Sequence, residues 1–266
     1  MAAGVSSRMK KSSSSQNMSK TQLDQSNKRM KGFIQVGEGM EPLIYYIIKN
    51  AISAEINNFY IIISGDSKDF QEYLKSLENK LGISSKFAFQ DFYGQEKPSG
   101  TSDAIFQTMN QYKELMKTRF LVCNCDNLYS SKAMELLKRE KNYNSMIAYD
   151  YECLNFSNER LSSFSILKIK NNFLSEITEK PDIEIIINND QKKYVSMNIF
   201  SFIGSKVYKY LKDCPVNIER GEKELASALQ NMILDDKESI KTFSLCEHVP
   251  DMTYKEDIEK INNFLN

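Results

Sequence analysis

The stretch that decides the fold class is FYIIISGD, residues 59–66. Phe59–Ser64 is apolar over its first five residues and rich in β-branched side chains, and a glycine and an aspartate end the run. A run of this length is typical of a strand that is buried on both faces of a sheet. Helices must then cover both faces, so the run indicates a parallel α/β sheet.

Helical and strand patterns alternate on both sides of this run. Residues 42–54 carry apolar side chains at helical spacing. Ser67 is placed to cap a helix that reaches about Leu81 and ends at Gly82. The same patterns predict strands at 86–90, 119–125 and 145–149, and helices at 101–116 and 131–140. This series predicts a doubly wound, mostly parallel, Rossmann-like sheet that binds ligands at the carboxyl ends of its strands.

The second half of the chain is expected to be richer in β structure. A hairpin is predicted from strands 164–169 and 173–177, turning at 170–172. Further strands are predicted at 183–187, 194–202 and 240–246, and helices at 204–212, 222–233 and from about 254. Because no linker or repeat interrupts the pattern, we expect one domain over 1–266, with halves of about 1–150 and 151–266.

Charge balance and histidine content exclude some classes of site. The chain has 35 Lys+Arg and 35 Asp+Glu, a formal net charge of zero. Non-specific binding to nucleic acid or an anionic membrane needs excess positive charge, so we expect neither partner. His248 is the single histidine, which excludes zinc sites that need two histidines of one chain, and we expect it in a surface loop.

The cysteine pattern favours reduced thiols. The five cysteines are an odd number and form no CxxC pair, so we expect buried, reduced side chains, as in a reducing cytosol, with a redox or metal role as the alternative. We find no apolar stretch of membrane-spanning length and no signal peptide, which favours a cytoplasmic location.

The N-terminal region departs from an ordinary α/β opening. Residues 10–30 are polar and serine-rich, so we expect a loop without regular structure. Only Met1–Ala3 precede Gly4, so either the first strand is very short or the natural start lies upstream of this chain.

Two segments have the composition of phosphate-binding loops. Ala2–Met9 is a loop of mostly small residues closed by Arg8. Small residues let backbone N–H groups approach a phosphate, and Arg8 adds a bidentate donor; a plain turn with a surface arginine is the alternative. Gly100 and Thr101 begin a predicted helix, where they would either hold a ligand at the positive helix end or simply cap it.

Carboxylates stand at strand and helix ends. Asp126 follows a predicted buried strand, where it suits Mg²⁺, although an Asp-Asn turn is the alternative. Glu179 and Lys180 end another strand and alone would be a solvated pair of charges. Asp251 precedes the last helix, for which it is also a suitable cap.

The order of these motifs along the chain resembles the sugar-phosphate nucleotidyltransferases, a doubly wound α/β family. The segments that match are Ala2–Met9, Lys31–Val36 with Pro42–Ile44, Gln95, Gly100–Ala104, Asp126–Asn127, Glu179–Pro181, Val195–Phe202 and Asp251–Ile258. The chain departs from the family where Lys10 and Lys11 replace an R-x-x-P continuation, and where Asn198 stands in place of the usual glycine.

This resemblance implies a role for each matching residue. Ala3 and Gly4 would cradle the nucleotide phosphates, with the catalytic cations Arg8 and Lys31 on the phosphates. The implied nucleobase contacts are Gln95, Gly100 and Thr101. The implied Mg²⁺ ligands are Asp126 and Asp251. The implied contacts with the sugar phosphate are Glu179, Lys180 and Asn198.

The activity that the resemblance implies is Mg²⁺-dependent transfer of a nucleoside monophosphate from an NTP to a sugar 1-phosphate, with release of pyrophosphate. Two alternatives stay open: a cytidylyltransferase for a non-sugar phosphate, and a non-catalytic protein that binds nucleotide sugars. The sequence leaves the base, the sugar and any homo-oligomer undetermined.

Overall fold

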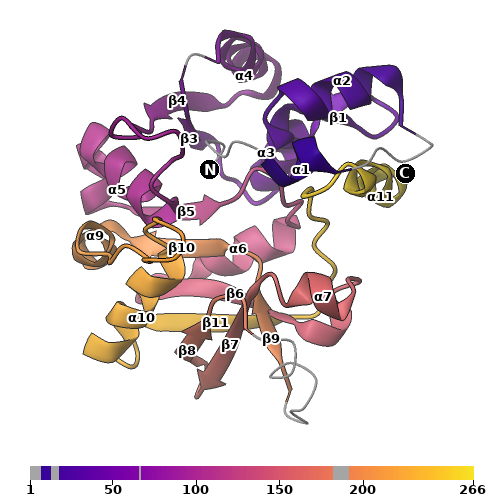
Figure 1. Ribbon diagram of the computed structural model, residues 1–266. Coiled ribbons are helices and arrows are strands. Elements are labelled where there is room, and N and C mark those ends of the chain that lie inside the picture. Colours follow the sequence, from indigo (N-terminus) through magenta and orange to yellow (C-terminus); the bar gives the residue numbers. More distant parts are fainter. Residues whose placement is uncertain (1–6, 13–17, 66, 182–191) are drawn as a thin grey trace. The chain divides into compact units, whose positions relative to one another are not determined.

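The computed structural model describes residues 7–12, 18–65, 67–181 and 192–266 (Figure 1). The chain forms two compact units, each assembled from separate stretches of sequence. Unit 1 contains Met1–Pro98, Asn124–Ser131 and Val249–Asn266, and unit 2 contains Ser99–Cys123 and Lys132–His248. The assignment of the whole chain to one domain stays a prediction.

A parallel strand–helix–strand element is the centre of unit 1. β3 (Asn58–Ile63) and β4 (Ser84–Phe89) pair in parallel, and α4 (Lys68–Leu81) connects them. The strand and helix predicted from residues 59–66 and their continuation are therefore confirmed. Gly82 ends α4 in the left-handed conformation, as its lack of a side chain allows. The expected side-chain cap does not form, because the Ser67 hydroxyl donates to the Ser64 carbonyl instead (3.5 Å).

Apolar residues from this element and from neighbouring segments form the core of unit 1. α3 (Leu43–Ser53) contributes one apolar face, as its helical spacing predicted. The buried members of this core are Phe33, Ile44, Ile48, Ile61, Ile63, Phe70, Leu74, Leu77, Ile83 and Cys125. Burying large aliphatic side chains stabilises a fold by about 1.5–3 kcal/mol each, so this cluster anchors the segment around Cys125.

The expectation of an unstructured loop over residues 10–30 is wrong where the structure describes it. α1 (Ser7–Lys11) and α2 (Lys20–Lys28) occupy much of this stretch, and 13–17 lie outside the described residues. Ser19 and Gln22 form a reciprocal capping box at the start of α2. The buried Gln25 side chain then bonds the Gln35 side chain (2.7 Å) and backbone N–H (2.9 Å) in β1 (Gln35–Val36). Amide pairs rather than apolar contacts hold this helix, which is why an apolar pattern did not reveal it.

In the described part of unit 2, seven strands form a mixed sheet in the order β11-β8-β7-β9-β6-β10-β5. Their bounds are β5 (Arg119–Cys123), β6 (Asn144–Asp150), β7 (Ser165–Lys170), β8 (Phe173–Thr178), β9 (Tyr194–Ser196), β10 (Ile199–Ile203) and β11 (Ile240–Leu245). β6 and β11 pair in parallel, and the other neighbours in this sheet are antiparallel. The α/β class with a β-rich second half is confirmed, although among the described strands parallel pairing is limited to β3–β4 and β6–β11.

The β-rich half follows the expected strand order with one interruption. The hairpin is confirmed, with both Asn171 and Asn172 at positive φ in its turn. The single strand expected over 194–202 is instead split into β9 and β10, because Asn198 adopts a left-handed φ of 59°. The strand expected at 183–187 lies outside the described residues.

Helices complete both units. Among the described residues of unit 2 the helices are α5 (Thr101–Gln111), most of α6 (Ser131–Arg139), α7 (Asn158–Leu161), α9 (Gly204–Lys212) and α10 (Leu225–Asp235), with 3₁₀ turns η2 (Lys113–Lys117) and η3 (Tyr151–Cys153). Unit 1 also contains η1 (Lys31–Phe33), β2 (Glu41–Pro42) and α11 (Glu256–Leu265). Within the described part of the chain, no helix combines the length and apolar character that a membrane span requires.

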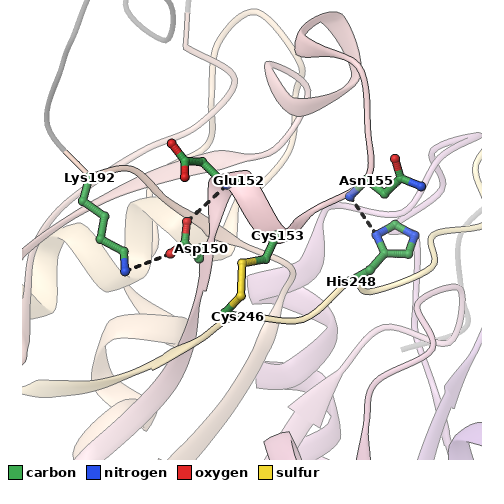
Figure 2. The surroundings of a disulfide bond; sticks show 7 residues. All are labelled: Asp150, Glu152, Cys153, Asn155, Lys192, Cys246 and His248. Carbon is green, nitrogen blue, oxygen red and sulfur yellow. Dashed lines mark hydrogen bonds and ion pairs between the residues drawn. A yellow bond between two sulfur atoms is a disulfide. The ribbon is translucent and has the colours of Figure 1, made fainter.

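A disulfide joins Cys153 in η3 to Cys246, the residue after β11, with Cα atoms 5.2 Å apart (Figure 2). The expectation that every cysteine is reduced is therefore wrong for this pair. β6 and β11 run parallel in register up to Tyr149 and Leu245, so the segments that leave both strands remain neighbours. Cys153 and Cys246 are 93 residues apart, so the sequence pattern alone does not show that they are neighbours.

His248 lies beside the same cross-link. Figure 2 shows its Nδ1 accepting a hydrogen bond from the Asn155 N–H (3.1 Å). Its ring also packs edge-on against Phe156, with centroids 4.9 Å apart. Burial lowers the pKa of the imidazole, which favours the neutral form that accepts this bond.

Candidate active site

Two backbone segments of unit 1 bring the predicted metal ligands together. Asn127 and Asp251 form an isolated antiparallel bridge. On either side of this bridge, the Leu128 N–H donates to the Pro250 backbone carbonyl (2.9 Å), and the Met252 N–H donates to the Asp126 backbone carbonyl (2.8 Å). Asp126 and Asp251 therefore lie on paired segments, although they are far apart in sequence.

The carboxylate of Asp251 is buried and hydrogen-bonded at both oxygens. Oδ1 accepts from the Asn127 side-chain amide (2.9 Å), and Oδ2 accepts from the Thr253 hydroxyl (2.8 Å). The role of helix cap does not fall to Asp251, since Lys255 occupies the cap position of α11 without a side-chain cap. We name Lys31, Asp126, Asn127, Asp251 and Thr253 the carboxylate cluster.

Lys31 is the cation of this cluster. Its Nζ lies 2.9 Å from Asp126 Oδ2, and both side chains are largely shielded, with 15% and 21% of their surfaces exposed. Burial alone lowers the pKa of Lys31, but Asp126 and Asp251 outweigh it and hold that pKa above its ordinary value. Lys31 is therefore a stable positive charge facing two carboxylates.

Glycine at position 32 allows this close approach. A Cβ atom on Gly32 would lie 2.9 Å from the carbonyl oxygen and 3.1 Å from the Sγ of Cys125. Since Cys125 directly precedes Asp126, a side chain at position 32 would force η1 away from the acidic segment. Burial raises the pKa of the Cys125 thiol to about 11, so this neighbour is an uncharged packing group.

The donors of the carboxylate cluster fit a hard divalent cation. Asp126 and Asp251 are oxygen ligands, and Mg²⁺ binds proteins through one or two carboxylates together with water and substrate phosphate oxygens. The described residues contain no group of three or more His, Cys, Asp or Glu side chains arranged around a common point. The cluster therefore suits a metal that takes most of its ligands from substrate and water.

The other unit 1 residues predicted to bind nucleotide are placed in part. Arg8 is exposed on α1, and its charge acts to lower the pKa of Lys31. The Lys255 ammonium donates to the Ser12 carbonyl (2.9 Å), which ties the chain after α1 to the segment after Asp251. Gln95 is exposed in a turn in which its N–H donates to Phe92 (2.9 Å). Ala3 and Gly4 lie outside the described residues.

Gly100 and Thr101 begin α5 in unit 2. Gly100 has a φ of 104°, and a Cβ there would lie 2.5 Å from the Lys223 carbonyl oxygen, so glycine is required twice over. The Thr101 hydroxyl accepts from the Leu225 N–H (3.2 Å) and thus caps α10 rather than its own helix. The alternative that Thr101 caps its own helix is therefore wrong.

Glu179 and Asn198 lie at one end of neighbouring strands in unit 2. Glu179 follows β8 and accepts a short hydrogen bond from Ser165, the first residue of β7. Ser165 pairs with Ser196 of β9, whose hydroxyl accepts from the Asn198 N–H (3.3 Å). We name Ser165, Glu179, Ser196 and Asn198 the strand-end cluster.

Lys180 directly follows the strand-end cluster in sequence at Glu179. Lys180 is exposed, with a positive φ of 45° that turns the chain directly after Glu179. Sequence reasoning missed the supporting residues Thr253, Ser165 and Ser196, because isolated hydroxyl residues give no pattern. Asn127 was visible in the Asp-Asn pair, but its contact with Asp251 was not.

The chain matches the family model described as "Nucleotidyl transferase" over residues 24–261. A curated relative, the "Bifunctional protein GlmU" of Methanocaldococcus jannaschii, is 23% identical over 225 residues, or 85% of this chain. That match covers 47% of the relative, so the chain spans about half of its length.

Two solved structures are similar to this chain in fold. One is a Bacillus anthracis protein assigned as a glucose-1-phosphate thymidylyltransferase, in complex with a sucrose, with a TM-score of 0.71 and 18% identity; the match covers 99% of this chain and 92% of that one. Another is a UDP-glucose pyrophosphorylase complexed with UDP-glucose, with a TM-score of 0.71 and 16% identity, covering 99% and 95%.

Proposed function

Because the chain belongs to the nucleotidyl transferase family, we propose that it transfers a nucleoside monophosphate from an NTP to a sugar 1-phosphate. The observation that carries this proposal is the carboxylate cluster, in which Lys31 pairs with Asp126 while Asp251 is held beside them. Two carboxylates that can hold Mg²⁺, together with a protein cation, provide the positive charge needed to bring two anionic substrates together.

The proposed reaction is a displacement at phosphorus. A phosphate oxygen of the sugar 1-phosphate forms a bond to the α-phosphorus, and the bond from that phosphorus to the β-phosphate oxygen breaks, so pyrophosphate leaves. The attacking phosphate is already largely ionised at neutral pH, since its second pKa is about 6, and no protein base is needed. Catalysis of this kind rests mainly on alignment and on stabilisation of negative charge.

Asp126 and Asp251 would hold Mg²⁺, which supplies positive charge to the reacting phosphates. Lys31 and Arg8 would supply further positive charge from the protein. The family resemblance also assigns phosphate contacts to the backbone of Ala3 and Gly4, which lie outside the described residues. The shielded position of Lys31 supports its role, because a charge interaction gains strength where water is excluded.

The remaining residues divide between the two substrates. Gln95, Gly100 and Thr101 contact the nucleobase. Glu179 and Asn198 bind sugar hydroxyls, and Lys180 binds the sugar phosphate. The strand-end cluster supports this division, because a carboxylate and an amide residue at one end of neighbouring strands suit a polyhydroxylated ligand.

The test is to incubate the chain with each of ATP, CTP, GTP, UTP and dTTP, Mg²⁺ and a panel of phosphate monoesters, and to measure pyrophosphate. Release with a sugar 1-phosphate supports the proposal. Release with choline phosphate alone supports the cytidylyltransferase alternative, and no release with any pair overturns catalysis in favour of the binding protein. A cytoplasmic location and assembly into a homo-oligomer stay proposals.

A further inference from the structure

We propose that Asn127 and Thr253 are positioning residues that fix the carboxylate of Asp251 for a divalent metal ion. The inference rests on the proposed function in one respect, namely that Asp251 is a metal ligand. It adds that two neutral side chains, neither of them a ligand, set the plane in which that carboxylate stands.

The orientation of the Asn127 amide is determined by its neighbours. Its Oδ1 lies within reach of two donors, the Asn124 side-chain amide (3.3 Å) and the Tyr129 hydroxyl (3.4 Å). Its Nδ2 then faces Asp251 Oδ1 at 2.9 Å. A flipped amide would set donors against donors and its own oxygen against a carboxylate, so only one orientation satisfies the network.

The support for Asn127 extends into the core of unit 1. Asn127 is 2% exposed, and Tyr129 is fully buried. The Tyr129 carbonyl accepts from the Asn50 side chain of α3 (2.8 Å). Because α3 packs in the apolar core, movement of the Asn127 amide would require a rearrangement of buried groups.

Thr253 acts on the other carboxylate oxygen. Its hydroxyl donates to Asp251 Oδ2 (2.8 Å), while its backbone N–H donates to Asp257 Oδ2 (2.8 Å) at the start of α11. One donor on each oxygen prevents rotation of the Asp251 carboxylate about its Cβ–Cγ bond. We call Asn127 and Thr253 the clamp. Hydrogen bonds connect Asn127 through Tyr129 to α3, and Thr253 to α11.

Neutral donors have a specific advantage at a metal ligand. The amide and the hydroxyl orient Asp251 without adding a formal charge of their own beside the carboxylate. Asp126 differs, because its partner Lys31 already neutralises much of its charge. In other proteins, removing groups that orient a metal ligand typically lowers metal affinity by about 10–100-fold.

The experiment measures Mn²⁺ binding to the full-length chain by electron paramagnetic resonance, without and with NTP. We expect Thr253→Val and Asn127→Ala to weaken Mn²⁺ binding by about 10–100-fold, and Thr253→Ser, which keeps the hydroxyl, to bind as the unchanged chain does. Thr108→Val is the matched control, since Thr108 is a buried threonine of unit 2 whose hydroxyl bonds only its own helix at Ala104. Circular dichroism establishes that each variant is folded.

The outcomes separate this inference from the proposed function. Weakening in Thr253→Val and Asn127→Ala with recovery in Thr253→Ser supports the clamp. Equal Mn²⁺ affinity in all variants overturns the clamp but leaves the proposed function intact. The clamp is also overturned if Thr253→Ser or Thr108→Val weakens Mn²⁺ binding as much as Thr253→Val does. No Mn²⁺ binding by the unchanged chain, together with no pyrophosphate release, overturns the proposed function and the clamp with it.

Discussion

The carboxylate cluster and the strand-end cluster differ in how the chain assembles them. Lys31 and Asp126 are 95 residues apart, and Asn127 and Asp251 are 124 apart. In the strand-end cluster, Ser165 and Glu179 are only 14 apart. The charged centre thus depends on long-range organisation of unit 1, whereas a local antiparallel pairing largely builds the strand-end cluster. Changes in the first should act on chemistry and metal binding, and changes in the second on acceptor binding.

The largest effect is expected from Asp126→Asn. The change preserves shape but removes a negative charge from the proposed metal site, where the metal is worth several kcal/mol to the transition state. At about 1.4 kcal/mol per tenfold, turnover should fall by at least ~100-fold in the pyrophosphate assay. A folded variant with near-normal turnover would remove Asp126 from the metal site and break the comparison.

Lys180→Ala should act mainly on the acceptor. Loss of a charge-assisted hydrogen bond costs about 1.5–3 kcal/mol, so KM for the sugar 1-phosphate should rise by about 10–100-fold. NTP binding, measured by isothermal titration calorimetry, should be unchanged. Lys168→Ala is the control, because Lys168 is an exposed lysine paired with Glu176 on the neighbouring strand. An equal loss of NTP affinity would contradict the assignment of Lys180.

Lys31→Met should change metal binding in the direction opposite to turnover. Without the ammonium, Asp126 and Asp251 lose their present counter-ion, so a divalent cation should bind the nucleotide-free chain a few-fold more tightly. Turnover should fall in the same variant. Calorimetry with Mg²⁺ measures the change in metal affinity. Weaker Mg²⁺ binding in Lys31→Met would contradict the prediction, because it would mean that Lys31 favours metal binding instead of competing with the metal for the carboxylates.

The smallest effect is expected from Asn198→Gly. Both residues accept a left-handed backbone, so the free energy of unfolding should change little. Asn198→Ala should lower it by about 1–2 kcal/mol, because an alanine at φ 59° is strained. Thermal unfolding of the two variants measures the difference. Equal melting temperatures would mean that the split between β9 and β10 does not depend on this backbone conformation.

Local pattern predicted much of the fold but little of the supporting network. β3 and α4 were predictable because apolar run, helical spacing and Gly82 all lie within one stretch of sequence. The family expected from the order of motifs is confirmed by the match over residues 24–261. α2 was not predictable, since paired glutamines hold it in place of an apolar face. The contacts of Asp251 with Asn127 and Thr253 depend on the pairing of two distant segments, which a single sequence does not display.

The disulfide between Cys153 and Cys246 makes the intervening stretch a covalent ring. That ring contains β7, β8, β9 and β10, and with them the whole strand-end cluster. A protease that cuts the backbone once inside the ring leaves both pieces attached to each other. The cut chain would therefore migrate as one band on a non-reducing gel and as two after a thiol reductant is added, so a gel reports whether the cross-link exists in the compartment where the chain resides.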